Sequence, residues 1–255
     1  MTSPLLEIFS SIQGEGLLLG ERQIFLRFVG CNLDCAYCDT PAARSEPPTC
    51  RMERSPGSQD FEEAANPLTI EDVSKAVVRL ARQQPGLHHS VALTGGEPLL
   101  HSDFLLQLLP AIGNFGLKAY LETNGTLADE LVRVLPHLDV VCADIKLPSA
   151  TQQAPIWGMH ERFLITLISM EDPARLDFAK CVVTADCDPE EIETAARLIL
   201  GIDPDMPLVL QPVTPIGEGV SAPSPQHILG LQAVAKRHLR RVRVIPQTHR
   251  IGGYL

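Results

Sequence analysis

The sequence predicts one α/β domain built around a parallel sheet, and three observations favour this fold class. The chain has 255 residues, which is enough for one substantial domain. Hydrophobic residues make up 45% and charged residues 20% of it, as in ordinary globular proteins. Short β-branched, apolar runs alternate with segments of helical periodicity. This βαβα order is typical of parallel strands joined by right-handed crossovers.

The expected elements follow one another along the chain. Strands are expected at 23–29, 90–94, 117–122, 140–145, 178–184, 208–211 and 242–245. Helices are expected at 69–84, from 102 onward, and at 127–135, 189–200 and 225–240. Thr69 and Asp72 resemble a capping box, and Ser102 is expected to cap the next helix. Periodicity alone fits both a partial barrel and an open sheet.

The stretch 41–67 interrupts this order. It is polar and rich in proline, which is typical of a long functional loop. We therefore expect a single domain over 1–255 with a loop insertion at 41–67.

The charge balance argues against a nucleic-acid partner, and the hydropathy argues against a membrane partner. The net charge is −10 and the pI is about 5.2, whereas a phosphate-backbone binder normally carries a basic patch. No apolar run is long enough to cross a bilayer, and the first residues lack the pattern of a signal peptide. We expect a cytoplasmic enzyme that acts on a small molecule.

Three of the seven cysteines, Cys31, Cys35 and Cys38, lie within eight residues of one another. Iron–sulfur clusters are held by cysteine thiolates, and a site held by protein alone uses four. Three ligands therefore leave one iron open, as a catalytic metal site requires. The alternative is a structural zinc site, which needs a fourth ligand such as Cys50 or a histidine. The other cysteines are scattered, and Cys142 and Cys181 fit small core residues.

Polar and glycine-rich segments follow several of the expected strands. One is Thr94-Gly95-Gly96-Glu97-Pro98, where Glu97 can accept hydrogen bonds from an ammonium group. The others contain Glu122-Thr123-Asn124, Asp144-Ile145-Lys146 and Gln211-Pro212-Val213-Thr214. Ligands of parallel α/β folds bind at the carboxyl ends of strands, so these segments are expected to share one site.

The Cys-x3-Cys-x2-Cys spacing, with Tyr37 before the last cysteine, resembles the radical S-adenosylmethionine (SAM) signature. The resemblance implies a partial TIM-like barrel of about six parallel strands with abbreviated helices. It also implies a [4Fe–4S] cluster on Cys31, Cys35 and Cys38, whose open iron binds SAM and generates a 5′-deoxyadenosyl radical. The SAM contacts that it implies are Tyr37, Cys38, Asp39, Gly95, Gly96, Glu97, Glu122, Thr123, Asn124, Asp144, Ile145, Lys146, Gln211, Pro212, Val213 and Thr214.

Both ends of the chain narrow the resemblance. The segments 7–16 and 25–33, and the tail 247–255, are similar to the 7-carboxy-7-deazaguanine synthase family. That family contracts the ring of 6-carboxy-5,6,7,8-tetrahydropterin and releases ammonia, on the way to queuosine and related deazapurines. The resemblance implies Mg²⁺ bound by Thr40, a homodimer, and an electron donor such as flavodoxin or ferredoxin. The substrate contacts that it implies are Ile12, Gln13, Gly14, Glu15, Arg27, Thr94, His249 and Leu255.

The side-chain chemistry suits such a substrate. Gln13 and Glu15 can pair with the amide edge of a pterin, and Arg27 can bind its carboxylate as a bidentate partner. Two other functions fit the cysteine motif. One is a radical SAM activase that makes a glycyl radical on a partner protein, and the other is a metal-binding module without catalysis.

Overall fold

The structure is a computed structural model, and it describes residues 1–170, 172–215 and 219–254. In these residues, a ten-stranded sheet has the order β12-β11-β10-β9-β8-β7-β3-β2-β4-β5. Its strands are β2 (Leu5–Ile12), β3 (Arg22–Phe28), β4 (Thr49–Glu53), β5 (Phe61–Ala65), β7 (Ser90–Gly95), β8 (Lys118–Thr123), β9 (Val140–Asp144), β10 (Leu176–Val183), β11 (Leu208–Pro212) and β12 (Val242–Val244). Strands β1 (Thr2–Ser3) and β6 (Leu68–Thr69) form a separate antiparallel pair.

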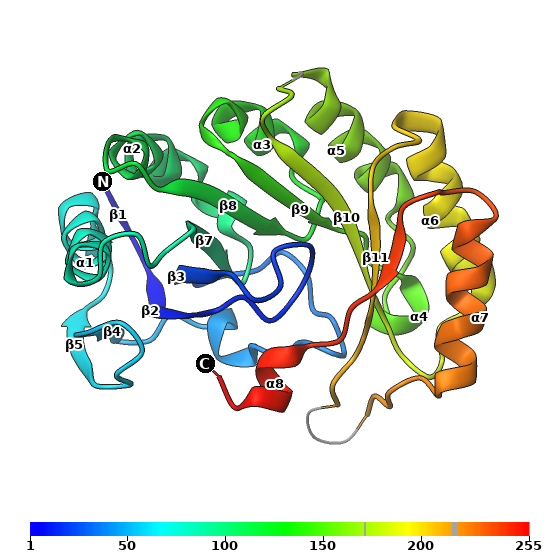
Figure 1. The fold of residues 1–255 in the computed structure, drawn as a ribbon, viewed down its shortest axis with the longest axis horizontal. Helices are drawn as coiled ribbons and strands as arrows, with labels where there is room; N and C mark the ends of the chain where they lie inside the picture. Colours follow the sequence, from blue (N-terminus) through cyan, green and yellow to red (C-terminus); the bar gives the residue numbers. More distant parts are fainter. Residues whose placement is uncertain (171, 216–218, 255) are drawn as a thin grey trace.

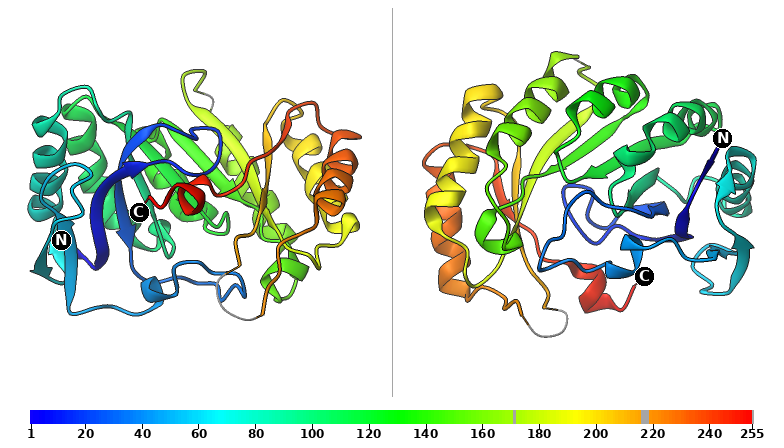
Figure 2. Two further views of the ribbon diagram at one scale, coloured as in Figure 1. Left: turned by 60° about the horizontal axis from the view of Figure 1, so that its bottom comes forward. Right: turned by 180° about the vertical axis from the view of Figure 1, so that it is seen from behind.

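In the described residues, seven consecutive strands of the sheet, β3 and β7 to β12, run parallel to one another, whereas β2 is antiparallel to β3. All of the strands expected from the sequence are among these seven. The sheet is curved, and the helices stand along its outer side while the C-terminal end of the chain lies on its inner side (Figures 1 and 2). The expected partial barrel is therefore confirmed, with one strand more than the six implied.

The longer helices of the outer layer are α1 (Ile70–Gln83), α2 (Ser102–Asn114), α3 (Ala128–Val134), α5 (Trp157–Ser169), α6 (Pro189–Ile202) and α7 (Pro225–Lys236). Thr69 and Asp72 form the expected capping box at α1, and Asp188 and Ser224 cap α6 and α7. The prediction that Ser102 caps α2 was wrong. Ser102 is the first residue of that helix, and its hydroxyl donates to Glu130 instead.

The expected loop at 41–67 is corrected by the structure. The segment begins with a 3-10 helix, η1 (Pro41–Arg44), and continues as an antiparallel hairpin of β4 and β5. The hairpin extends the sheet, because β4 pairs with β2. Cys50 is fully buried in this hairpin. The segment 41–67 is rich in proline, which disfavours strands, so its composition predicted a loop.

The two faces of the sheet differ in what they bury. The outer face packs against the helices in a large apolar core that includes Leu26, Leu93 and Leu121. The inner face carries a row of larger residues, among them Phe25, Tyr120 and Phe178. Beyond this row, toward the carboxyl ends of the strands, the inner face becomes polar. No helix among the described residues has both the length and the apolar character needed to span a bilayer.

Candidate functional site

A cavity of about 440 Å³ lies on the inner face at the carboxyl ends of the parallel strands. The strand register explains which side chains reach it. Paired residues on neighbouring strands line the cavity together, namely Arg27 with Thr94, Glu122 with Cys142, Asp144 with Lys180, and Val182 with Gln211. Carboxyl ends of parallel strands are where such folds bind ligands.

The loop after β3 brings the three motif cysteines to this cavity. Cys31, Cys35 and Cys38 all line it, are half-buried and carry free thiols. Burial raises the pKa of Cys35, which the nearby Lys146 ammonium partly counteracts. Of the other four cysteines, Cys142 reaches the cavity wall, and all four are buried. The meeting of these three thiols at one cavity supports a cluster with three cysteine ligands. The loop contains no fourth cysteine.

The two glycines of the segment after β7 allow close packing of the chain on itself. A side chain on Gly95 would collide with the backbone of Phe28, and one on Gly96 with the carbonyl of Gly30. Gly95 also has a φ of 116°, a conformation that side chains rarely adopt. The cysteine loop is thereby fixed against β7, while both glycines still line the cavity.

Glu97 is fully buried and lies behind the cavity wall. Its carboxylate accepts hydrogen bonds from the Leu99 amide (3.0 Å), the Thr123 hydroxyl (2.8 Å) and the Asn124 amide (2.7 Å). Burial raises the pKa of Glu97, and these bonds counteract the rise. In this structure Glu97 fixes Thr123 and Asn124, which do line the cavity.

A charged network connects the end of β9 to the cysteine loop. The Lys146 ammonium lies 2.9 Å from an oxygen of Asp144 and donates to the Tyr37 hydroxyl at 3.1 Å. Burial opposes the charge of Lys146, but the Asp144 carboxylate raises the lysine pKa well above its usual value. The second oxygen of Asp144 is buried without a partner in the described residues. Such an acceptor is stabilised when a ligand donates to it.

His160 on α5 holds the ends of β8 and β9 in place. Its Nδ1 lies 3.0 Å from the carbonyl oxygen of Gly125, and its Nε2 accepts from the Lys146 amide at 3.0 Å. Because a carbonyl only accepts, the hydrogen must be on Nδ1. Burial lowers the pKa of His160 to about 4, so the ring is neutral at pH 7.

The loop after β2 brings Glu15 into the cavity. Its Oε2 lies 2.7 Å from the Lys180 ammonium, and its Oε1 accepts from the Gln247 amide at 2.8 Å. Burial alone would raise the pKa of Glu15, but Lys180 and these hydrogen bonds lower it to about 2. Glu15 is therefore ionised at any working pH.

Next to Glu15, the Gln13 amide donates to Gln23 (2.9 Å) and to Glu122 (2.8 Å), which also accepts from the Thr94 hydroxyl (3.0 Å). Burial raises the pKa of Glu122, although Lys180 counteracts it. This second acid therefore retains a proton more readily than Glu15 does. The pKa values of Glu15 and Glu122, two buried acids of one cavity, are thus shifted in opposite directions.

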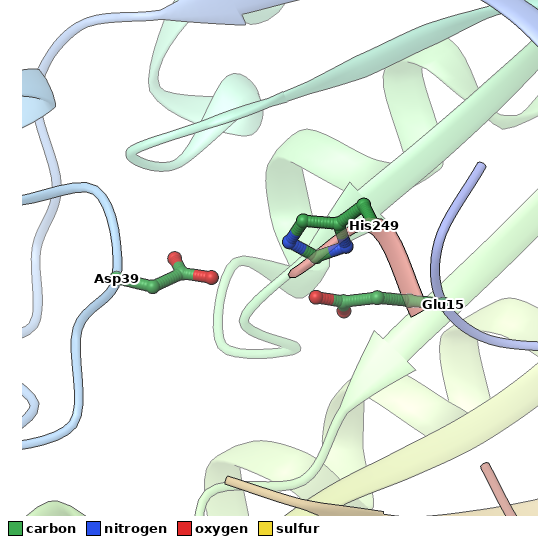
Figure 3. Close-up of side chains that lie close together, drawn as sticks. All are labelled: Glu15, Asp39 and His249. Atoms are coloured by element: carbon green, nitrogen blue, oxygen red, sulfur yellow. The ribbon is translucent and has the colours of Figure 1, made fainter. Parts of the chain in front are cut away.

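Glu15, Asp39 and His249 gather at the mouth of the cavity, with one potential ligand atom of each within 4.8 Å of the others (Figure 3). The Gln247 amide already bridges the two acids, donating to Glu15 at 2.8 Å and to Asp39 at 3.0 Å. An amide donor between two carboxylates satisfies them without a cation.

Arg27, on β3, also lines the cavity. Its Nε forms an ion pair with Glu7 at 2.9 Å, and its Nη1 lies 3.4 Å from the Thr40 hydroxyl, which itself donates to Asp39 at 3.1 Å. This places a cationic fork beside the hydroxyl expected to bind Mg²⁺.

The C-terminal segment covers one side of the cavity. After β12 the chain passes through Gln247 into the short helix α8 (Thr248–Gly252), where the Thr248 amide donates to the Gly14 carbonyl at 2.9 Å. His249 packs on Gly14 so closely that a side chain there would collide with the imidazole. His249 and Tyr254 line the cavity, while the predicted contact Leu255 lies outside the described residues.

Most of the residues expected at the site border this one cavity. The expected residues that do not line it are Glu97, Ile145, Pro212 and Thr214. Ile145 is buried in the core beneath the site, and the Thr214 amide donates to Gln247. Sequence reasoning missed the roles of Lys180, Gln247 and His160. Lys180 carried one usable signal, because a charge stands within the apolar run of β10.

Comparisons with known proteins agree with this geometry. Residues 26–161 match the family model described as "Radical SAM superfamily". The chain is 45% identical to a "7-carboxy-7-deazaguanine synthase" of Geobacter sulfurreducens, over 98% of this chain and 96% of that protein. A protein of the same name from Methanothermobacter thermautotrophicus is 34% identical over 99% of this chain and 98% of its own length.

Among solved structures, QueE from Escherichia coli superimposes with a TM-score of 0.58 at 21% identity, covering 98% of this chain and 95% of that one. This supports the fold. The family match and the near-full-length relatives show that this chain belongs to the radical SAM superfamily and, within it, to the 7-carboxy-7-deazaguanine synthase family.

Proposed function

We propose that this enzyme contracts the ring of 6-carboxy-5,6,7,8-tetrahydropterin to 7-carboxy-7-deazaguanine and releases ammonia. The observation that carries the proposal is the meeting of three free cysteines and the paired acid Glu15 in one cavity. The three cysteines suit a cluster that initiates radical chemistry. The ionised Glu15 suits a substrate edge that donates hydrogen bonds.

The residues present fit a [4Fe–4S] cluster and SAM. Cys31, Cys35 and Cys38 would hold the cluster, since all three thiols are free and reach the same space. Around that space, Asp144 Oδ1 is a buried acceptor without a partner in the described residues. It would accept from a hydroxyl or amino donor of SAM. Bound together, cluster and SAM supply the radical that starts the reaction.

The chain's own residues would orient the pterin. Glu15, ionised and fixed by its two partners, would accept from the N–H groups of the pyrimidine edge. Arg27 would bind the carboxylate with its free guanidinium donors, and Thr40 beside it would contribute a hydroxyl oxygen to Mg²⁺. His249 and the helix α8 would exclude water from one side.

Three further features belong to this proposal. The enzyme would act in the cytoplasm as a homodimer and receive electrons from a donor such as flavodoxin or ferredoxin. Neither nucleic acid nor membrane would bind directly, in keeping with the net charge of −10.

The proposal is tested by anaerobic incubation of the reconstituted enzyme with carboxytetrahydropterin, SAM, Mg²⁺ and dithionite. Formation of 7-carboxy-7-deazaguanine, identified by its mass, is the expected result. SAM cleavage without this product would point to an activase instead. No SAM cleavage by cluster-loaded protein would leave a metal-binding module.

A further inference from the structure

Lys180 is a buried charge on β10 to which the proposed reaction assigns no task. Only 9% of its side chain is exposed, and its ammonium lies 2.7 Å from Glu15 Oε2 and 3.7 Å from Asp144 Oδ2. An ammonium removed from water is costly unless it is paired and hydrogen-bonded. The pairing with Glu15 connects strand β10 to the loop after β2, which are 165 residues apart in sequence.

Glu15 is held on both of its oxygens. Lys180 donates to Oε2, and Gln247 donates to Oε1 at 2.8 Å. An ionised carboxylate has about four acceptor sites, so Glu15 retains capacity for a further donor. Since Glu15 lines the cavity, this remaining capacity is available to a ligand there.

Gln211 adds another acceptor to the same wall. It lies on β11, next to β10, and is 1% exposed. Its Oε1 is buried and has no partner in the described part of the chain. A buried carbonyl oxygen without a donor is destabilising until a ligand supplies one. Acceptors therefore accumulate on this wall, which suits a ligand edge rich in N–H groups.

We propose that Lys180 is a positioning residue that fixes Glu15 as an acceptor for the two adjacent N–H groups on the amidine edge of the substrate's pyrimidine ring. Gln211 offers the neighbouring acceptor. Lys180 itself touches Glu15 and Asp144 rather than the substrate. This inference rests on the proposed function, because the amidine edge belongs to the pterin.

The test compares pterin turnover by the cluster-loaded enzyme and four variants: Glu15→Gln, Lys180→Met, the double variant, and the control Lys118→Met. Lys118 is exposed at the start of β8, so its variant should keep the wild-type kinetics. A charge-assisted hydrogen bond contributes about 1.5–3 kcal/mol, so Glu15→Gln and Lys180→Met should each raise KM about tenfold or more. The pyrimidine ring is common to the pterin and to the 7-deazaguanine product, so kcat should change less than KM.

The double variant separates positioning from a merely structural role. If Lys180 acts through Glu15, the double variant should have the KM of Glu15→Gln alone, because the two effects are not additive. The preference for the pterin over its 2-deamino analogue should fall equally in all three site variants.

A further rise in KM, of about tenfold, from Glu15→Gln to the double variant would overturn the inference. So would a Lys180→Met enzyme that matches Lys118→Met. The comparison of Glu15→Gln with the double variant tests the inference even if Lys180→Met alone does not fold. The double variant has no carboxylate at position 15 that would be left unpaired. Absence of wild-type turnover would instead refute the proposed function, and this inference with it.

Discussion

Acid should destabilise the protein through His160. In the folded state burial lowers the pKa of His160 from 6.5 to about 4, whereas the unfolded chain takes up the proton near 6.5. The unfolded state thus binds more protons between these values, and stability falls as the pH is lowered through this window. Protonation would also place a hydrogen on Nε2, facing the Lys146 amide that it now accepts from.

The magnitude follows from the two pKa values. A difference between 6.5 and about 4 corresponds to at most about 3.4 kcal/mol, at about 1.36 kcal/mol per pH unit. The two-state binding expression places about 2 kcal/mol of this loss above pH 5. For a domain of ordinary stability, this is a large fraction of the total.

The assay is urea unfolding between pH 7.5 and 5, followed by the fluorescence of Trp157, the only tryptophan of the chain. His160→Asn removes the titrating ring. We therefore compare the difference in free energy of unfolding, wild type minus variant, at the two ends of the pH range. This difference should be about 2 kcal/mol smaller at pH 5 than at pH 7.5. His137→Asn, at an exposed position, is the matched control and should follow the wild type. A wild-type advantage over His160→Asn that does not change with pH would refute the reasoning.

Three further predictions concern the site. Alanine should abolish SAM cleavage at each of the three expected ligands, Cys31, Cys35 and Cys38, whereas Cys50→Ala should keep the low-temperature EPR signal of the reduced cluster. Loss of that signal in Cys50→Ala would contradict the ligand set. Thr40→Val should raise the Mg²⁺ concentration needed for half-maximal turnover with the cluster intact, and an unchanged Mg²⁺ titration would exclude this role. Arg27→Ala should weaken pterin binding by about tenfold or more, given about 1.5–3 kcal/mol for charge-assisted bonds. An equal loss of SAM affinity would mean that Arg27 is structural.

Local chemistry made much of the fold predictable. The strands from β3 to β12 are short apolar runs between helices, and a capping box marked the start of α1. The hairpin of β4 and β5 was missed because its strands are polar and flanked by prolines, and its pairing with β2 is a long-range contact. Helix α5 was missed because Trp157–Ser169 lies in a stretch with no cap at its start.

In the candidate site, too, some residues could be predicted from the local sequence and others could not. Spacing alone predicted Cys31, Cys35 and Cys38 as the cluster ligands, and the structure places all three at one cavity. Lys180 and Gln247 act through Glu15, which is 165 and 232 residues away, respectively. Such pairs depend on strand order and register, and no local pattern reveals them.

The contacts of residues 247–254 join segments from both ends of the sequence. Thr248 donates to the Gly14 carbonyl at 2.9 Å, and Gln247 donates to Asp39, next to Cys38, at 3.0 Å. The site is therefore complete only when the loop after β2, the cysteine loop and the segment after β12 are all in place. A displacement of this one segment would disturb the substrate wall and the cysteine loop together.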